Sequence, residues 1–188
     1  MTPITTVVRN GVETATLFAT PDAVDRAPEA AQFRFRAHNR WIPAMHSEAT
    51  IQDYFSASDE GIDEAATVHD ADHPTAPVGD DRAPTHVEYL VHALASSLTA
   101  GLVNIAADRG VELVEVTSTI EGDINFYGVL GLDAEMRNGF ERVRVRFAVK
   151  GNASPDKLRE IVEQAQARSA VFDVITNGVA VSVVVDPR

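Results

Sequence analysis

One long apolar helical segment in the middle of the chain constrains the fold most strongly. Residues 85–109 carry almost no charge, and their leucines and isoleucine recur on one helical face at Leu90, Leu94, Leu98, Leu102 and Ile105. Thr85 and Glu88 form a capping box at the start, and Gly110 suits the end. A helix of this kind has to be buried, so we predict a domain built around it.

The same segment is long enough to be weighed as a membrane span. Its uncharged run, residues 89–107, also contains polar side chains, among them His92, Ser96, Ser97 and Asn104. A buried helix of a globular protein is therefore the better interpretation, and no membrane partner is expected.

Alternating apolar and polar residues predict strands on both sides of this helix. Asn10–Gly11 lies between two β-prone runs, which is a strong hairpin signal. The further strands are expected within residues 32–37, 46–55, 113–120, 142–150 and 179–185. A second helix is predicted after Ser154, which is suited to the N-cap and is followed by Pro155.

Residues 56–84 interrupt these patterns. They hold eight acidic residues, one basic residue and three prolines, a composition typical of a solvated loop. Because this loop is long for a compact domain, we expect it to cover part of the protein or to cross to a partner.

Composition excludes several functional classes. The net charge of −12 argues against nucleic acid as a partner, because phosphate binding needs a basic surface. The chain has no cysteine, so it has neither disulfides nor thiol catalysis. The first residues show no basic region followed by an apolar core, so we expect no signal peptide and a cytoplasmic location. No cofactor is expected.

These elements predict an α+β fold, a mostly antiparallel sheet packed around a long buried helix. The expected order is three or four strands, the long helix, two strands, a helix and a final strand. A chain of 188 residues fits one domain. Its parts would be N-terminal strands (1–55), the acidic loop (56–84) and the helix–strand–helix–strand portion (85–188).

Two stretches of sequence carry a family resemblance. "APTHVEYLVHALASSLTAG", residues 83–101, and "AQARSAVFDVITNGVAVSV", residues 165–183, occur in the order and at the separation seen in the OsmC/Ohr family. The chain therefore resembles these small bacterial proteins, many of which reduce organic hydroperoxides. The resemblance implies an OsmC-like fold and an intertwined homodimer with a pocket between subunits.

The resemblance also implies which positions once carried the chemistry. In the family, a cysteine on the long helix attacks the peroxide and a second cysteine on the later helix resolves the sulfenic acid. These positions correspond to Ser97 and Ser169 here, and a serine hydroxyl cannot pass through sulfenic acid. A family glutamate ten residues before the first cysteine corresponds to Val87. The arginine that it positions corresponds to Arg34, Arg36 or Arg40, and the sequence does not choose among them.

Other side chains suggest competing chemistry. Ser96 follows His92 by one helical turn, which suggests a hydrolase using His92 with Ser96 or Ser97. A bond from Ser96 back to the carbonyl of His92 is the simpler explanation, because no nucleophile elbow is present. His69 and His73 in "HDADH" have the spacing of a helical metal site, but Pro74 and the acidic context favour a solvated segment.

Arg142, Arg144 and Arg146 share one strand face, and we expect them to pair with carboxylates of the protein itself.

Three functional interpretations remain. The first is an OsmC-like protein that lacks peroxidase activity and binds a small apolar or lipid-like molecule. Its pocket would involve His92, Ser96, Ser97, Ser169 and Phe172. The second is the hydrolase. The third is a hydroperoxide reductase of the oxidative stress response in which serine has been substituted for both cysteines.

Overall fold

The computed structural model describes residues 8–56, 59–76 and 78–187. The chain forms two compact units: one contains Glu13–Leu90, and the other contains Val8–Val12 with the chain from Val91 onward. The expected α+β class is confirmed, because helices and antiparallel sheets make up both units.

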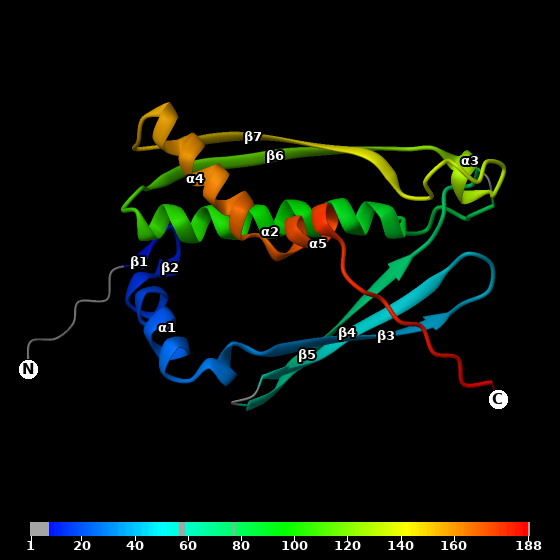
Figure 1. Cartoon of the computed structure of the whole chain (residues 1–188), viewed down its shortest axis with the longest axis horizontal. Coiled ribbons are helices and arrows are strands. Elements are labelled where there is room, and N and C mark those ends of the chain that lie inside the picture. Colours follow the sequence, from blue (N-terminus) through cyan, green and yellow to red (C-terminus); the bar gives the residue numbers. More distant parts are fainter. Residues whose placement is uncertain (1–7, 57–58, 77, 188) are drawn as a thin grey trace, which may run out of the picture. The chain divides into compact units, whose positions relative to one another are not determined.

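The first unit contains a three-stranded antiparallel sheet (Figure 1). Its elements are α1 (Thr14–Arg26), a short 3-10 helix (Pro28–Ala31), β3 (Phe33–Trp41), β4 (Ser47–Ser56) and β5 (Asp59–Ala71). β4 is the central strand and pairs with both neighbours. The strands expected at 32–37 and 46–55 are therefore present.

The expectation of a loop over the whole of residues 56–84 is wrong, because β5 occupies Asp59–Ala71. β5 pairs with β4 over most of its length, with Ser47 opposite Ala71. It is the edge strand of its sheet, and charged residues are common on edge strands because they discourage further pairing. The acidic residues therefore belong partly to an edge strand and partly to an irregular segment. This segment is shorter than expected and lies between β5 and α2.

The Asn10–Gly11 turn is confirmed, but its strands are short. β1 (Val8–Arg9) and β2 (Val12–Glu13) flank the turn, where both central residues have positive φ, 53° at Asn10 and 80° at Gly11. This is the backbone shape of a type I′ turn, which suits asparagine followed by glycine. The β-prone run after the turn leaves the strand at Glu13 and continues as helix α1. Alanine, the best helix former, recurs in this helix at every fourth residue.

The second unit contains a two-stranded antiparallel sheet with helices beside it (Figure 1). Its elements are β1 and β2, most of α2 (His86–Asp108), β6 (Leu113–Ile124), α3 (Phe126–Val129), β7 (Phe140–Gly151), α4 (Pro155–Arg168) and α5 (Ala170–Asn177). The N-cap of α4 is Ser154, whose side chain accepts a hydrogen bond from the backbone of Lys157, as predicted.

The core of this unit lies between α2, α4 and the β6–β7 sheet. Leu102 and Ile105 of α2 pack with Ile161 and Ala165 of α4, and half-buried side chains of both strands complete the cluster. Leu94 and Leu98 are also buried. The expected apolar stripe of α2 is therefore correct except at its first member, Leu90, which is 40 % exposed. By length and composition α2 would also pass as a membrane span, but these buried positions give it a place in a protein core.

The strand expected at 179–185 is absent. The chain beyond Gly178 has no regular secondary structure, and its valines are 66 % to 84 % exposed. A strand needs a neighbouring strand to take its backbone hydrogen bonds. No strand of the described chain pairs with this segment.

The β1–β2 hairpin is tied to the far end of α2. Asn10 donates from Nδ2 to the carbonyl of Val111 and accepts at Oδ1 from the backbone of Leu113, both at 2.8 Å. Arg9 donates to the carbonyl of Ala107 at 3.0 Å, and the same carbonyl accepts the backbone N–H of Gly110 at 3.2 Å. The turn residue predicted from sequence therefore also joins the hairpin to the core.

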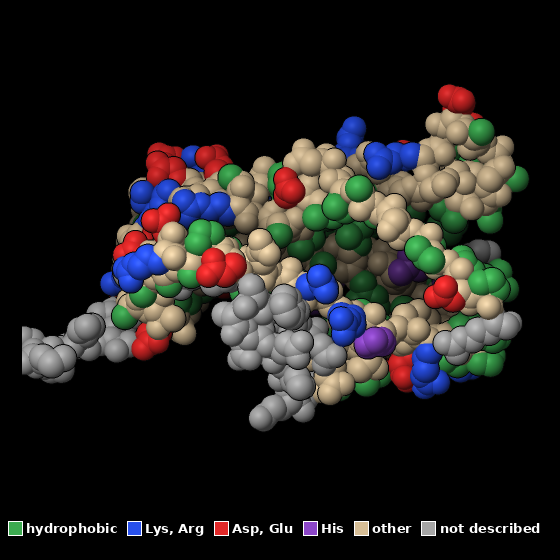
Figure 2. Space-filling view, turned by 60° about the horizontal axis from the view of Figure 1, so that its bottom comes forward, with side chains coloured by type: hydrophobic (Ala, Val, Ile, Leu, Met, Phe, Trp, Pro, Cys, Tyr) green, Lys and Arg blue, Asp and Glu red, His purple; other side chains and the backbone are tan. Residues whose placement is uncertain are grey.

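Charged side chains are mixed over the surface. Figure 2 shows acidic, basic and hydrophobic side chains interspersed on the face that it draws. On β7, Arg144 forms ion pairs with Asp123 and Glu121 of β6, and Lys150 pairs with Glu115. These contacts confirm for Arg144 the expected pairing within the protein.

Candidate functional site

Two serines from distant parts of the chain meet within the second unit. Ser97 lies in the middle of α2, and Ser169 lies between α4 and α5, 72 residues later. Their hydroxyl oxygens are 2.8 Å apart. The structure thus brings together the two positions that the resemblance assigned to a pair of reacting cysteines.

Local structure holds Ser169 in place. It is the N-cap of α5, and its Oγ accepts a hydrogen bond from the backbone N–H of Phe172 at 3.1 Å. Ser169 is only 7 % exposed, and Ser97 is half-buried. Serine is among the preferred N-cap residues, so this position has a structural role as well as its contact with Ser97.

The helix that follows Ser169 is apolar but incompletely covered. None of the side chains of α5 is buried, and Val171, Phe172 and Ile175 are half-buried. Val174 is 45 % exposed. Beside the two hydroxyls there is accordingly apolar surface that this chain does not fully cover by itself.

Ser96 and His92 do not form a nucleophile and base. The hydroxyl of Ser96 donates to the backbone carbonyls of His92 and Ala93, each at 3.1 Å. Both residues are exposed. The predicted bond back to the carbonyl of His92 is therefore confirmed, and this bond engages the proton that a histidine base would have to remove.

Glu88 has the structural role that the capping box predicts. Its carboxylate accepts hydrogen bonds from the backbone N–H of Thr85 at 2.7 Å and from its hydroxyl at 2.8 Å. The Thr85 hydroxyl in turn accepts from the Glu88 N–H at 3.2 Å. These bonds lower the pKa of Glu88 from its ordinary value of 4.5. Val87, at the expected position of the family glutamate, is half-buried.

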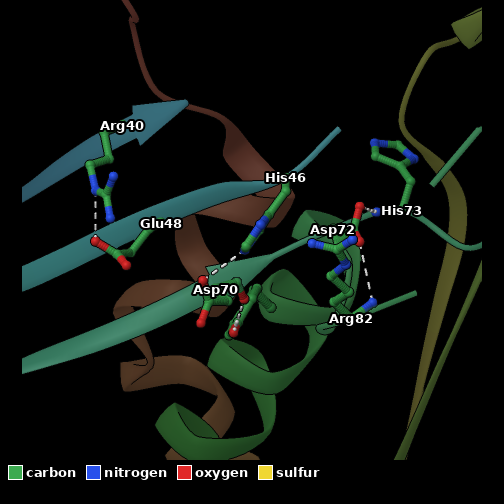
Figure 3. A network of polar contacts seen from close by, with 8 residues as sticks. Arg40, His46, Glu48, Asp70, Asp72, His73 and Arg82 are labelled. Carbon is green, nitrogen blue, oxygen red and sulfur yellow. Dashed lines mark hydrogen bonds and ion pairs between the residues drawn. The ribbon is translucent and has the colours of Figure 1, made fainter. Parts of the chain in front are cut away.

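The three candidate arginines all lie on β3, in the first unit, whereas both serines lie in the second. Arg40 pairs with Glu48, the residue opposite it on β4, at 2.8 Å (Figure 3). The hydrogen bond and charge of Glu48 raise the pKa of Arg40. That one of these three arginines belongs to the site stays a prediction.

A polar network that the sequence did not reveal lies near the start of α2 in the first unit (Figure 3). His46 Nε2 lies 2.8 Å from Asp70 Oδ1, and Tyr89 donates to the backbone carbonyl of Asp70 at 2.6 Å. These contacts fasten the end of β5 to its neighbours. No spacing in the sequence connects these residues, so the network could not be anticipated.

Asp72 organises the irregular stretch before α2. It is 2 % exposed, and its two carboxylate oxygens accept hydrogen bonds from the backbone of His73 at 2.7 Å and of Arg82 at 3.2 Å. Burial alone would raise the pKa of Asp72, but the backbone hydrogen bonds lower it overall. A buried carboxylate satisfied by backbone groups has a structural role, and we assign it no chemistry.

The metal hypothesis at "HDADH" rests on a helix that does not form. His69 lies in β5 with its ring against Tyr89, whereas the ring of His73 packs against that of His86 at a centroid distance of 4.8 Å. Within the described ranges, no group of three or more potential ligands has the geometry to hold a metal ion.

Comparison with known proteins matches this arrangement to one family. The family model for OsmC-like protein matches residues 79–184, more than half of the chain, and includes both serines. The chain belongs to the OsmC-like family. No curated protein sequence matches it.

Solved structures agree on the fold. An OsmC-like protein from Mycoplasma pneumoniae aligns with a TM-score of 0.55 at 11 % identity, over 76 % of this chain and 86 % of that one. An organic hydroperoxide resistance protein OsmC from Legionella pneumophila aligns with a TM-score of 0.54 at 13 % identity, over 79 % and 93 %. An OsmC-like protein of unknown function from Vibrio cholerae gives 0.53 at 13 %, over 76 % and 94 %.

This family member has no sulfur at the site. The chain contains no cysteine, and the two hydroxyls that meet at the α2–α5 contact cannot be oxidised to a disulfide.

Proposed function

We propose that this OsmC-like protein binds a small apolar or lipid-like molecule beside Ser97 and Ser169 and does not reduce hydroperoxides. The observation that carries the proposal is the contact between the two hydroxyls at 2.8 Å, next to an apolar helix that the chain leaves partly uncovered. The family's reaction requires a thiolate, whereas its pocket requires only shape and apolar surface.

The hydroxyl pair supports binding because it is ordered and polar within apolar surroundings. Ligand pockets are commonly lined by apolar side chains with a few polar groups that orient the ligand. Ser169 is held by the backbone of Phe172, and the buried Leu94 and Leu98 flank Ser97 along α2. Phe172 and Val174 provide adjacent apolar surface.

We propose further that the protein is a cytoplasmic homodimer whose partner completes the apolar pocket. The exposed valines of residues 179–185 support this, because their pattern suits a strand and no strand among the described residues pairs with them. Light scattering of the full chain at micromolar concentration tests the assembly. A mass of about 20 kDa would reject the dimer, since a single chain is 20.3 kDa.

Mass spectrometry of molecules retained by the purified protein tests ligand binding. Native spectra of the protein are compared with those of Phe172→Asp, which introduces a charge into the proposed apolar wall. We expect an apolar molecule to co-purify with the unaltered protein and to be lost from the variant. Equal amounts of the molecule on the unaltered protein and on the variant would show that it binds elsewhere. If the purified protein carries no bound molecule and also takes up no added lipid, the proposal is wrong.

Activity assays separate the competing interpretations. The chain is expected to show no thiol-dependent reduction of cumene hydroperoxide, because no atom in it can form a sulfenic acid. A hydrolase would instead turn over short-chain esters and lose this activity in Ser97→Ala or Ser96→Ala. Ester turnover that is lost in either of these variants would favour the hydrolase over the binding protein.

A further inference from the structure

The hydrogen bonds at the serine pair have a direction that can be worked out atom by atom. A backbone N–H can only donate, so the 3.1 Å contact between Phe172 and Ser169 makes the Ser169 oxygen an acceptor. The 2.8 Å contact between the two hydroxyls leaves open which oxygen donates. A hydroxyl has one proton and two lone pairs, so the remaining partners decide the direction.

The arrangement in which Ser169 donates leaves fewer buried groups without a partner. If Ser97 donated instead, the proton of Ser169 would need another acceptor, and the described part of the chain provides none. Ser169 is only 7 % exposed, so water cannot readily replace that acceptor. A buried donor without an acceptor is costly, which favours the arrangement in which Ser169 donates to Ser97.

The proton of Ser97 is then left free. A serine within a helix often donates to a carbonyl one turn earlier, as the neighbouring Ser96 does to His92 and Ala93. Ser97 makes no such bond among the described residues, and its one partner is Ser169. Its proton therefore points to whatever molecule lies beside the half-buried Ser97.

We propose that Ser97 donates this hydrogen bond to an uncharged carbonyl oxygen of the ligand, as in a ketone or an ester with an apolar chain. The inference rests on the binding function proposed above and adds the ligand's polar group. An amine cannot accept from Ser97 once protonated. A carboxylate can accept, but neither serine contacts a cationic side chain in the described chain, and an unpaired charge in apolar surroundings is strongly disfavoured.

A set of probes with one chain length tests this proposal. Binding of decane, 2-decanone, decanoate and decylammonium to the full-length protein is measured by competition with a fluorescent apolar probe. We expect 2-decanone to bind about two- to tenfold more tightly than decane, which is the usual net value of one hydrogen bond. Ser97→Ala should remove this preference, so that 2-decanone and decane bind to the variant with similar affinity.

Ser96→Ala is the matched control, because the Ser96 hydroxyl is one residue away and already bonded to backbone carbonyls. It should keep the preference for the ketone. The infrared carbonyl stretch of bound 2-decanone gives a direct readout, since a donated hydrogen bond lowers its frequency. We expect the lowering with the unaltered protein and with Ser96→Ala, but not with Ser97→Ala.

The outcomes separate the two proposals. If none of the four probes binds, the binding function itself is wrong. Equal affinity for decane and 2-decanone would overturn only the assignment of Ser97 as donor. Tighter binding of decanoate than of the ketone would also overturn it, because it would require a cationic group at the site.

Discussion

The hydroxyl oxygens of Ser97 and Ser169 lie 2.8 Å apart, although the residues are 72 positions apart in the chain. The contact joins the middle of α2 to the N-cap of α5. Two side chains held this close by two separate helices are suited to a covalent bond, and two serine hydroxyls cannot form one. Replacing them tests whether the geometry for the family's disulfide remains.

The double variant Ser97→Cys/Ser169→Cys should form a disulfide on mild oxidation. A disulfide needs sulfurs about 2.05 Å apart, and the 2.8 Å contact already brings the ends of the two side chains close to that distance. Closing so long a loop should raise the free energy of unfolding by about 4 kcal/mol. Mass spectrometry after alkylation checks the bond, with each single cysteine variant as a control that cannot form it within one chain. Persistent free thiols in the oxidised double variant would contradict the prediction.

The same double variant should reduce organic hydroperoxides slowly. Without a glutamate–arginine pair to stabilise the thiolate, a cysteine at position 97 should keep a pKa near about 8.5, with a few per cent ionised at neutral pH. Adding Val87→Glu should increase the rate of cumene hydroperoxide consumption. Val87→Gln is the uncharged control. Fast turnover in the double variant alone would show that another residue already activates position 97.

Asn10→Ala should destabilise the second unit by about 1–3 kcal/mol. The substitution leaves the backbone groups of Val111 and Leu113 without their partners, and alanine is strained at the positive φ of 53°. Asn10→Asp should cost less, because it keeps the acceptor for the Leu113 N–H and tolerates this backbone conformation. Urea unfolding followed by circular dichroism measures both. Equal stability of Asn10→Ala and the unaltered protein would show that the hairpin is not coupled to the core.

The contribution of Glu88 to stability should depend on pH. Its pKa is lowered in the folded state by hydrogen bonds from Thr85, so the ionised form stabilises the fold. This stabilisation is fully present above the ordinary pKa of 4.5 and is lost as the pH falls through the lower folded value. Because the carboxylate is exposed, solvent screening limits the effect to less than about 1 kcal/mol.

The matching variant is Glu88→Gln, which retains a capping oxygen but cannot titrate. The difference in unfolding free energy between it and the unaltered protein should be constant near neutral pH and decrease in acid. A difference that grows as the pH falls would reverse the sign and refute the assignment.

Sequence patterns predicted the elements whose signals are local. The capping box at Thr85 and Glu88, the N-cap at Ser154 and the turn at Asn10–Gly11 each depend on neighbouring residues, and the structure contains all three. The alternating strands at 32–37 and 142–150 are correct for the same reason, since apolar residues recur there at every second position.

Elements that depend on distant partners were missed. A loop was expected at β5, because its acidic composition does not reveal that the segment pairs with β4. The final strand was expected from its valines, yet a strand forms only with a neighbouring strand, and none of the described strands pairs with this segment. The family resemblance, and no spacing in the sequence, implied that Ser97 and Ser169 belong to one pocket, and it did not predict their hydrogen bond. The contact of His46 with Asp70 had no signal in the sequence.

The bonds of Arg9 and Asn10 to the end of α2 mean that the second unit is discontinuous in sequence. Among the described residues, the chain enters this unit at Val8, leaves it after Val12 to build the other unit, and returns to it at Val91. The first unit is in this sense an insertion after Val12. A recombinant fragment cut at the limits of the family match, residues 79–184, would lose the Arg9 bond to the carbonyl of Ala107 and the Asn10 bonds to the backbone of Val111 and Leu113. Tags and deletions at the N-terminus should therefore leave residues 8–12 intact, although these residues lie outside the family match.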